Sequence, residues 1–164
     1  MKLASRLLDY LDQNKVWYVR MSHPRAYTAQ EIAAVQHIPG SEMAKTIILK
    51  ADEDFVMMVV PATKRIAIET LKEKLPYREI TFATEYEFAW LFPDSEVGAM
   101  PPFGNLYDLT VYVDKSLSTH KEIVFNAGTH AETIRMLYKD FEALVRPKII
   151  DLFSSRHNVL PKAG

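Results

Sequence analysis

Cysteine is absent from this chain of 164 residues. The protein therefore has no disulfide framework, no thiolate-ligated zinc or iron–sulfur site and no thiol nucleophile. Its five histidines show no metal-ligand spacing, so we expect neither a metal nor another cofactor. No apolar run approaches the roughly 20 residues that span a bilayer, and the N-terminus lacks the apolar segment of a signal peptide. These absences predict a cytoplasmic protein with no membrane partner.

Glycine is also scarce, with five in the whole chain. The patterns G-x-G-x-x-G, G-x-x-x-x-G-K-[ST] and G-x-S-x-G are all missing, which argues against dinucleotide-binding, P-loop and α/β-hydrolase sites. Three of the four internal glycines, Gly98, Gly104 and Gly128, fall within one stretch. The backbone is expected to need unusual freedom there.

Net charge is close to zero, with 20 Lys and Arg against 21 Asp and Glu. Such a chain cannot neutralise many phosphates at once, so we expect no DNA partner and no long nucleic-acid footprint. A small footprint, such as the end of one strand, remains compatible with this charge.

The hydrophobic pattern predicts a single domain over residues 1–153, followed by a polar C-terminal tail at residues 154–164. About seven strands alternate with four or five helices, and the pairs with short connections must be antiparallel. Residues 46–49 and 55–60 are continuously apolar, which is typical of strands buried on both faces. The expected fold class is α+β, with flanking helices around one mixed, curved, barrel-like sheet.

Two capping-box patterns predict helix N-termini, one formed by Thr28 with Glu31 and the other by Thr84 with Glu87. We assign these four polar residues to structure and leave them out of the candidate site. The aromatic residues near the second box are assigned to the core, not to a platform for stacked bases: Phe82, Phe88, Trp90 and Phe92.

Lys45 stands directly before the first buried strand, which begins at Thr46. A lysine there either extends into solvent or points into a pocket. In a pocket its ammonium would bind a phosphate or carbonyl oxygen, or stabilise an oxyanion, and one such charged hydrogen bond contributes about 1.5–3 kcal/mol.

The stretch from Gly98 to Gly104 is the most unusual segment, because two glycines bracket Pro101, Pro102 and Phe103. The prolines make the middle rigid, and the glycines allow a close approach at each end. Such a loop can present backbone groups to a ligand, or it can be a plain structural turn.

A second glycine motif, Gly128-Thr129-His130, follows a predicted strand that ends at Asn126. His130 would lie at the tip of a hairpin. Histidine is the usual acid or base near neutral pH, but a single histidine can equally be a structural residue.

Together these three motifs, with His23-Pro24 and Thr28-Ala29-Gln30-Glu31 before them, resemble the YbaK/ProX family of aminoacyl-tRNA deacylases over most of the chain. That family is related to the editing insertion domain of bacterial prolyl-tRNA synthetases. The resemblance implies a catalytic Lys45 that holds the terminal nucleotide and a catalytic Gly98 whose backbone positions the ester carbonyl and the water. It also implies a substrate-binding set: Thr46, Pro102, Phe103, Gly104, Gly128, Thr129 and His130. Thr129 replaces the serine of the family's G-S-H motif, which puts the amino-acid specificity in question.

The implied function is trans-editing hydrolysis of a mischarged tRNA carrying a small amino acid of the Ala, Ser, Thr or Cys type. The implied partners are the tRNA acceptor end and an aminoacyl-tRNA synthetase. An ester is already activated, so a positioned water and an oxyanion donor suffice. Limited contact with the terminal nucleotides would come from Lys45, Lys50, Lys64 and Arg65. Two alternatives stay open: a non-catalytic module of the same fold that binds an amino acid, nucleotide or synthetase, and a hydrolase of another small ester.

Overall fold

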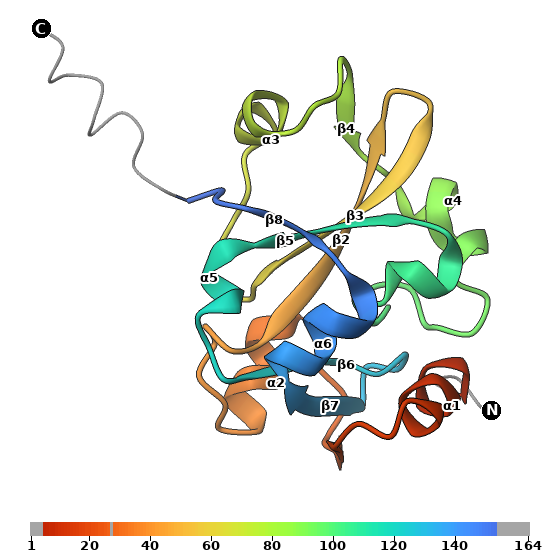
Figure 1. Ribbon diagram of the computed structural model, residues 1–164, viewed down its shortest axis with the longest axis vertical. Helices are drawn as coiled ribbons and strands as arrows, with labels where there is room; N and C mark the ends of the chain where they lie inside the picture. Colours follow the sequence, from red (N-terminus) through yellow and green to blue (C-terminus); the bar gives the residue numbers. More distant parts are fainter. Residues whose placement is uncertain (1–4, 27, 154–164) are drawn as a thin grey trace, which may run out of the picture.

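The computed structural model describes residues 5–26 and 28–153, in which the chain forms two β-sheets with helices packed around them (Figure 1). The smaller sheet has the antiparallel order β1-β7-β6. Its strands are β1 (Tyr18–Ser22), β6 (Glu122–Asn126) and β7 (Glu132–Leu137). The larger sheet has the order β4-β2-β3-β5-β8. Its strands are β2 (Ala44–Ala51), β3 (Asp54–Pro61), β4 (Ile80–Phe82), β5 (Thr110–Asp114) and β8 (Lys148–Ile150).

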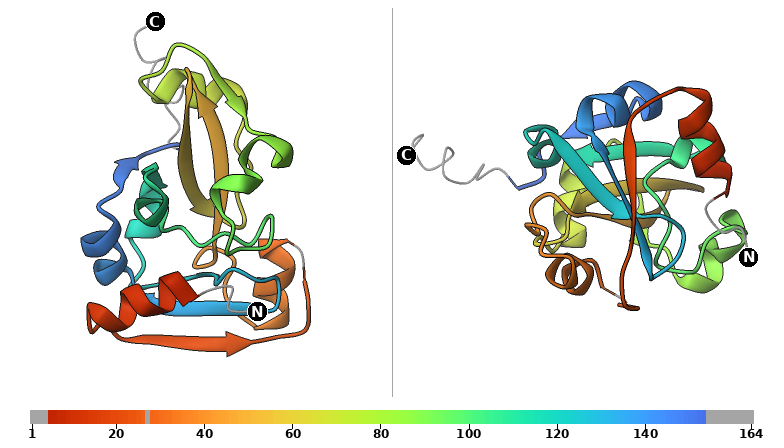
Figure 2. Two further views of the ribbon diagram at one scale, coloured as in Figure 1. Left: turned by 90° about the vertical axis from the view of Figure 1, so that its right-hand side faces the viewer. Right: turned by 90° about the horizontal axis from the view of Figure 1, so that it is seen from below.

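Short helices connect and cover the strands. The α-helices are α1 (Ser5–Gln13), α2 (Ala29–Val35), α3 (Ile68–Lys74), α4 (Glu85–Phe88), α5 (Lys115–Ser118) and α6 (Tyr138–Val145). Two 3₁₀ turns complete the set, η1 (Ala89–Leu91) and η2 (Gly104–Tyr107). In the left view of Figure 2 the smaller sheet lies across the foot of the β2–β3 hairpin. No helix in the described part of the chain is long and apolar enough to cross a membrane.

The predicted α+β class is confirmed, but the expectation of one barrel-like sheet is wrong. The described strands form two sheets that are linked by the isolated bridge between Met43 and Val124. The larger sheet stays open because its edge strands β4 and β8 do not pair with each other. β3 pairs with β5, and β5 with β8, in parallel. An apolar pattern predicts that a segment is a strand but not which strands pair with it. The parallel pairing of β5 with β3 and β8 was therefore not predictable from the sequence.

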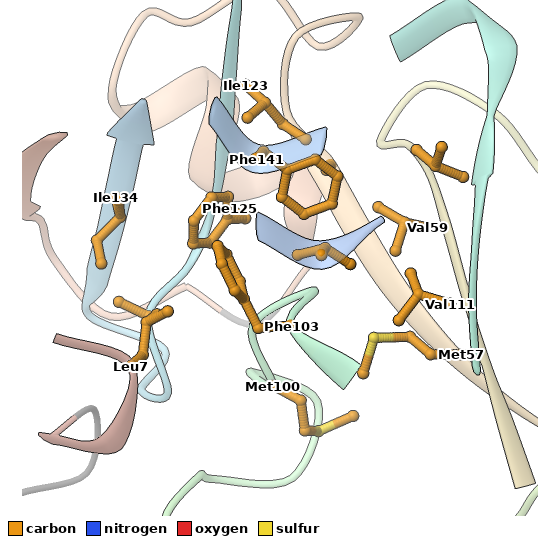
Figure 3. Packing of buried hydrophobic residues seen from close by; sticks show 14 of the residues in the cluster. Leu7, Met57, Val59, Met100, Phe103, Val111, Ile123, Phe125, Ile134 and Phe141 are labelled. Carbon is orange, nitrogen blue, oxygen red and sulfur yellow. The ribbon is translucent and has the colours of Figure 1, made fainter. Parts of the chain in front are cut away.

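The main hydrophobic core lies between the two sheets, and Phe103 is one of its fully buried members (Figure 3). The ring of Phe103 packs against Phe125 and Phe141, each with a centroid distance of 5.5 Å. The opposite face of the larger sheet has a second core that includes Leu71 of α3. β3 contributes alternate residues to the two cores, which confirms that this strand is buried on both faces.

The aromatic residues around α4 divide between core and surface. Phe88 and Phe92 are buried, as predicted, and lie four residues apart on one face. The prediction is wrong for Phe82 and Trp90, which are 45% and 69% exposed. Phe82 is the last residue of the edge strand β4, and Trp90 lies on η1 between the buried Phe88 and Phe92, so both side chains remain outside the core.

Truncating Phe103 tests its role in the core. We expect Phe103→Ala to lower the free energy of unfolding by about 3–5 kcal/mol, because it leaves a cavity among packed rings. Urea unfolding followed by circular dichroism measures the loss. Trp90→Ala is the control, since exposed substitutions change stability by about 0.5 kcal/mol or less. Equal, small losses in the two variants would contradict this view of the core.

Candidate functional site

The first half of β2 has an open edge. β4 pairs with β2 from Leu49 to Ala51, and the Ala83 N–H donates to the Ile48 carbonyl at 3.0 Å where β4 has ended. In an antiparallel strand the N–H and C=O of one residue point to the same side, and residues alternate sides. Thr46, two residues before Ile48, therefore directs its backbone donor and acceptor toward this open edge.

A pocket of about 400 Å³ lies against this edge. Its lining residues come from β2, the start of α2 and the loops after β3 and η1: Thr28, Ala29, Gln30, Lys45, Thr46, Ala62, Arg65 and Gly98. Two of these described residues are cationic and none is acidic. The charge of the pocket thus favours an anionic ligand.

Lys45 is the less exposed of the two cations that line the pocket. Its side chain is half-buried, and burial, together with the nearby Arg65 guanidinium, lowers the pKa of Lys45 below its usual value. The ion pairs found among the described residues include neither Lys45 nor Arg65. Two neighbouring cations that share a pocket without a protein counter-ion repel each other, and a bound anion would relieve this repulsion.

The start of α2 forms one wall of the pocket. Both predicted capping boxes are present, and in α2 the Glu31 N–H donates to Thr28 Oγ1 while the Thr28 N–H donates to the Glu31 carboxylate, each at 3.0 Å. The Gln30 amide donates to the Ala62 carbonyl at 2.9 Å and so ties α2 to the chain after β3. Thr28 thus caps α2 and also lines the pocket. The capping pattern in the sequence predicted only the first of these roles.

Gly98 also lines the pocket. Its φ of +87° lies in the left-handed region that favours glycine. The Gly98 N–H donates to the thioether sulfur of Met100 at 3.2 Å. Its carbonyl oxygen accepts no hydrogen bond from the described residues. The backbone group of Gly98 that remains for a ligand is thus the carbonyl.

The hairpin between β6 and β7 holds the Gly98 loop. The Glu96 N–H donates to the Gly128 carbonyl at 2.8 Å, and the Gly128 N–H donates to the Ala99 carbonyl at 3.0 Å. Gly128 has a φ of +97°. The Nε2 of His130 lies 2.8 Å from the Val97 carbonyl oxygen. A carbonyl can only accept, so Nε2 carries a proton.

His130 and Thr129 lie at the hairpin tip, as predicted. The His130 ring is buried beside Gly98, because a Cβ built on Gly98 would lie 3.4 Å from the His130 Cε1. The Thr129 hydroxyl accepts the Ala131 N–H at 3.2 Å and stabilises the turn. The structure thus brings Gly128, Thr129 and His130 to the loop that carries Gly98.

The predicted loop from Gly98 to Gly104 is split between the pocket and the core. Pro102, Phe103 and Gly104 are all buried, and none of them lines the pocket. Gly104 begins η2 and leaves no room for a side chain, since its Cβ would lie 2.6 Å from Val111 Cγ2. Because Phe103 packs into the core, this half of the loop anchors the half that reaches the pocket.

The other predicted cations have different surroundings. Lys50 pairs with Glu87 at 2.9 Å, and the Lys64 ammonium lies over the Phe153 ring at 5.4 Å. Arg65 is thus the predicted contact residue that joins Lys45 at the pocket. Residues 5–26 and 28–153 contain no cluster of three His, Asp or Glu side chains suited to a metal ion.

A comparison with known proteins identifies the family of this chain. The sequence profile of the aminoacyl-tRNA editing domain matches residues 23–144. The chain therefore belongs to the aminoacyl-tRNA editing domain family, which confirms the predicted resemblance. It is also 29% identical over 109 residues to the proline–tRNA ligases of two Staphylococcus epidermidis strains. The match spans 66% of this chain but 19% of those ligases, so the chain corresponds to a small part of their length.

Solved structures share the fold. One neighbour, described as a candidate trans-editing enzyme for prolyl tRNA synthetase, has a TM-score of 0.78 at 21% identity, covering 92% of this chain and 96% of its own. A second, a hypothetical protein, has a TM-score of 0.80 at 20% identity, covering 90% of this chain and 98% of its own. At these identities the likeness establishes the fold alone.

Replacing Lys45 tests whether this lysine serves to bind a ligand or to stabilise the folded protein. A lysine whose pKa is lowered on folding costs stability at every pH below its folded pKa, and the cost disappears as the pH rises to the unfolded value. We therefore expect Lys45→Met to keep or raise the melting temperature at pH 7, with a smaller difference near pH 10. Calorimetry over that pH range measures it. A marked loss of stability at pH 7 would assign Lys45 to the structural framework.

Proposed function

We propose that this protein removes a small, wrongly attached amino acid from the 3′-terminal adenosine of a tRNA by hydrolysing the ester bond. The observation that carries the proposal is the pair of cations, Lys45 and Arg65, facing a pocket beside Gly98 in an editing-domain fold. The relatives and neighbours named above support a role in editing. The action in trans and the identity of the amino acid are proposals.

Lys45 and Arg65 would hold the terminal nucleotide. Its phosphate is an anion, which the described lining residues do not supply, and it would raise the lowered pKa of Lys45. The pocket volume of about 400 Å³ is within the range of small-ligand sites. Contact with only one or two nucleotides also agrees with the net charge of −1, because such a chain cannot neutralise many phosphates at once.

The reaction needs a positioned water and a donor for the developing oxyanion. The water oxygen attacks the ester carbonyl carbon, the bond to the ribose oxygen breaks, and that oxygen takes up a proton. The Thr46 N–H at the open edge of β2 would donate to the oxyanion. One such donor contributes about 3–4 kcal/mol to the stability of the transition state.

Gly98 and His130 would orient the reactants. The Gly98 carbonyl can accept a hydrogen bond from the attacking water or from the substrate's amino group. The Nε2 proton of His130 is held by the Val97 carbonyl, so that nitrogen does not take a proton from water. We assign the base to the substrate's own ribose hydroxyl or amino group. His130 and the hairpin tip would then hold the Gly98 loop in place beside the amino acid.

A second candidate function is a non-catalytic binding module of the same fold. None of the described residues that line the pocket is an aspartate, glutamate or histidine, so no protein side chain there is an obvious general base. Tight binding of aminoacyl-tRNA without turnover would favour this alternative.

The proposal is tested by deacylation of tRNAs that carry Ala, Ser, Thr, Cys or Pro. We expect rapid loss of one or two of these amino acids. Lys45→Met should slow the reaction about 10- to 100-fold, because it removes a charged hydrogen bond worth about 1.5–3 kcal/mol. Lys72→Met, at an exposed lysine of α3, is the control and should keep the rate.

Two results would contradict the proposal. One is that every ester outlasts the assay in the presence of the protein. The other is an unchanged rate for Lys45→Met. Competition with uncharged tRNA separates a tRNA-directed enzyme from a hydrolase of free small esters, because only the former is inhibited.

A further inference from the structure

The side chain of Glu96 joins three segments of the chain at one oxygen atom. Glu96 Oε1 accepts a hydrogen bond from the Arg25 guanidinium at 2.6 Å and another from the backbone N–H of His130 at 3.0 Å. Arg25 belongs to the segment that leads to α2, and His130 to the β6–β7 hairpin. Glu96 itself lies two residues before Gly98.

His130 is consequently held at both ends by neighbouring residues of one loop. Its backbone N–H is bound by the Glu96 carboxylate, and its ring Nε2 donates to the Val97 carbonyl. The backbone of Glu96 is also engaged, because its N–H donates to Gly128 and its carbonyl accepts the Ala99 N–H at 3.0 Å. These bonds form a closed clamp around Gly98.

The clamp has little to contribute to overall stability. The Arg25 and Glu96 side chains are 49% and 28% exposed, and ion pairs this close to solvent contribute about 0–1 kcal/mol. The hydrogen bond from Arg25 lowers the pKa of Glu96, so its carboxylate stays ionised at neutral pH. A charged acceptor that binds two donors does fix the orientation of the groups that it joins. A reaction that depends on the placement of backbone atoms needs such fixed orientations.

We propose that Glu96 is a positioning residue for ester hydrolysis, which acts by clamping the His130 amide so that His130 stays packed against Gly98 and Gly98 keeps its place at the pocket. Arg25 orients the Glu96 carboxylate. This inference rests on the proposed function, because its effect on rate requires the hydrolysis to take place.

Glu96→Ala removes the clamp, and Glu96→Gln keeps an acceptor while losing the charge. We expect kcat to fall about 10- to 100-fold in Glu96→Ala and less in Glu96→Gln, with KM for the aminoacyl-tRNA changed less than about threefold. Arg25→Met should cost less in a Glu96→Ala background than alone, because the two residues act together.

Glu132→Ala is the matched control. Glu132 pairs with Arg20 between β1 and β7 at 2.8 Å, and the two side chains are 51% and 25% exposed, nearly as in the Arg25–Glu96 pair. We expect a similar change in melting temperature and no change in kcat. A kcat for Glu96→Ala equal to that of Glu132→Ala would overturn the inference.

Hydrogen exchange of the His130 amide provides a readout that does not depend on activity. We expect faster exchange in Glu96→Ala than in the wild type, and no change in Glu132→Ala. Unchanged exchange in Glu96→Ala would overturn the clamp even if kcat fell. If the wild type hydrolyses no ester while the exchange result is as expected, the proposed function fails and the clamp remains.

Discussion

The site depends on a pair of cations, Lys45 and Arg65, which lie at the open edge of a buried strand and form no ion pair with the described residues. Lys45 and Arg65 line one pocket, burial lowers the pKa of Lys45, and the described lining residues supply no carboxylate. Such an arrangement costs stability in the free protein, and a bound anion would relieve that cost. The early end of β4 leaves the backbone of Thr46 uncovered beside these charges.

The fold brings the backbone of Thr46 and Gly98 to the pocket beside these cations, and the described lining residues include no carboxylate or imidazole. Phe103 anchors one half of a loop in the core, and the β6–β7 hairpin holds the other half through Gly128 and Glu96. Gly98 is then presented at a positive φ with its carbonyl available. An activated ester needs little more than this, since placement and oxyanion stabilisation can supply most of the rate enhancement.

Local patterns predicted local features well. The continuous apolar run of β3 and both capping boxes are as expected, and Lys45, Thr46 and Gly98 do reach one pocket. Contacts between distant segments were not predictable. The proline–glycine motif gave no sign that Phe103 and Gly104 turn into the core, and nothing near Glu96 in the sequence indicates His130, because that contact exists only after the hairpin has folded against the loop.

The pKa of the Lys45 ammonium is the most direct test of the central claim. It can be followed by NMR of lysine labelled at Nζ, in the free protein and with a non-hydrolysable 3′-aminoacylamino-adenosine 5′-phosphate. We expect a depressed value in the free protein and a rise on binding, with a smaller rise for the analogue without phosphate. An ordinary pKa in the free protein, or one that the phosphate leaves unchanged, would contradict the account.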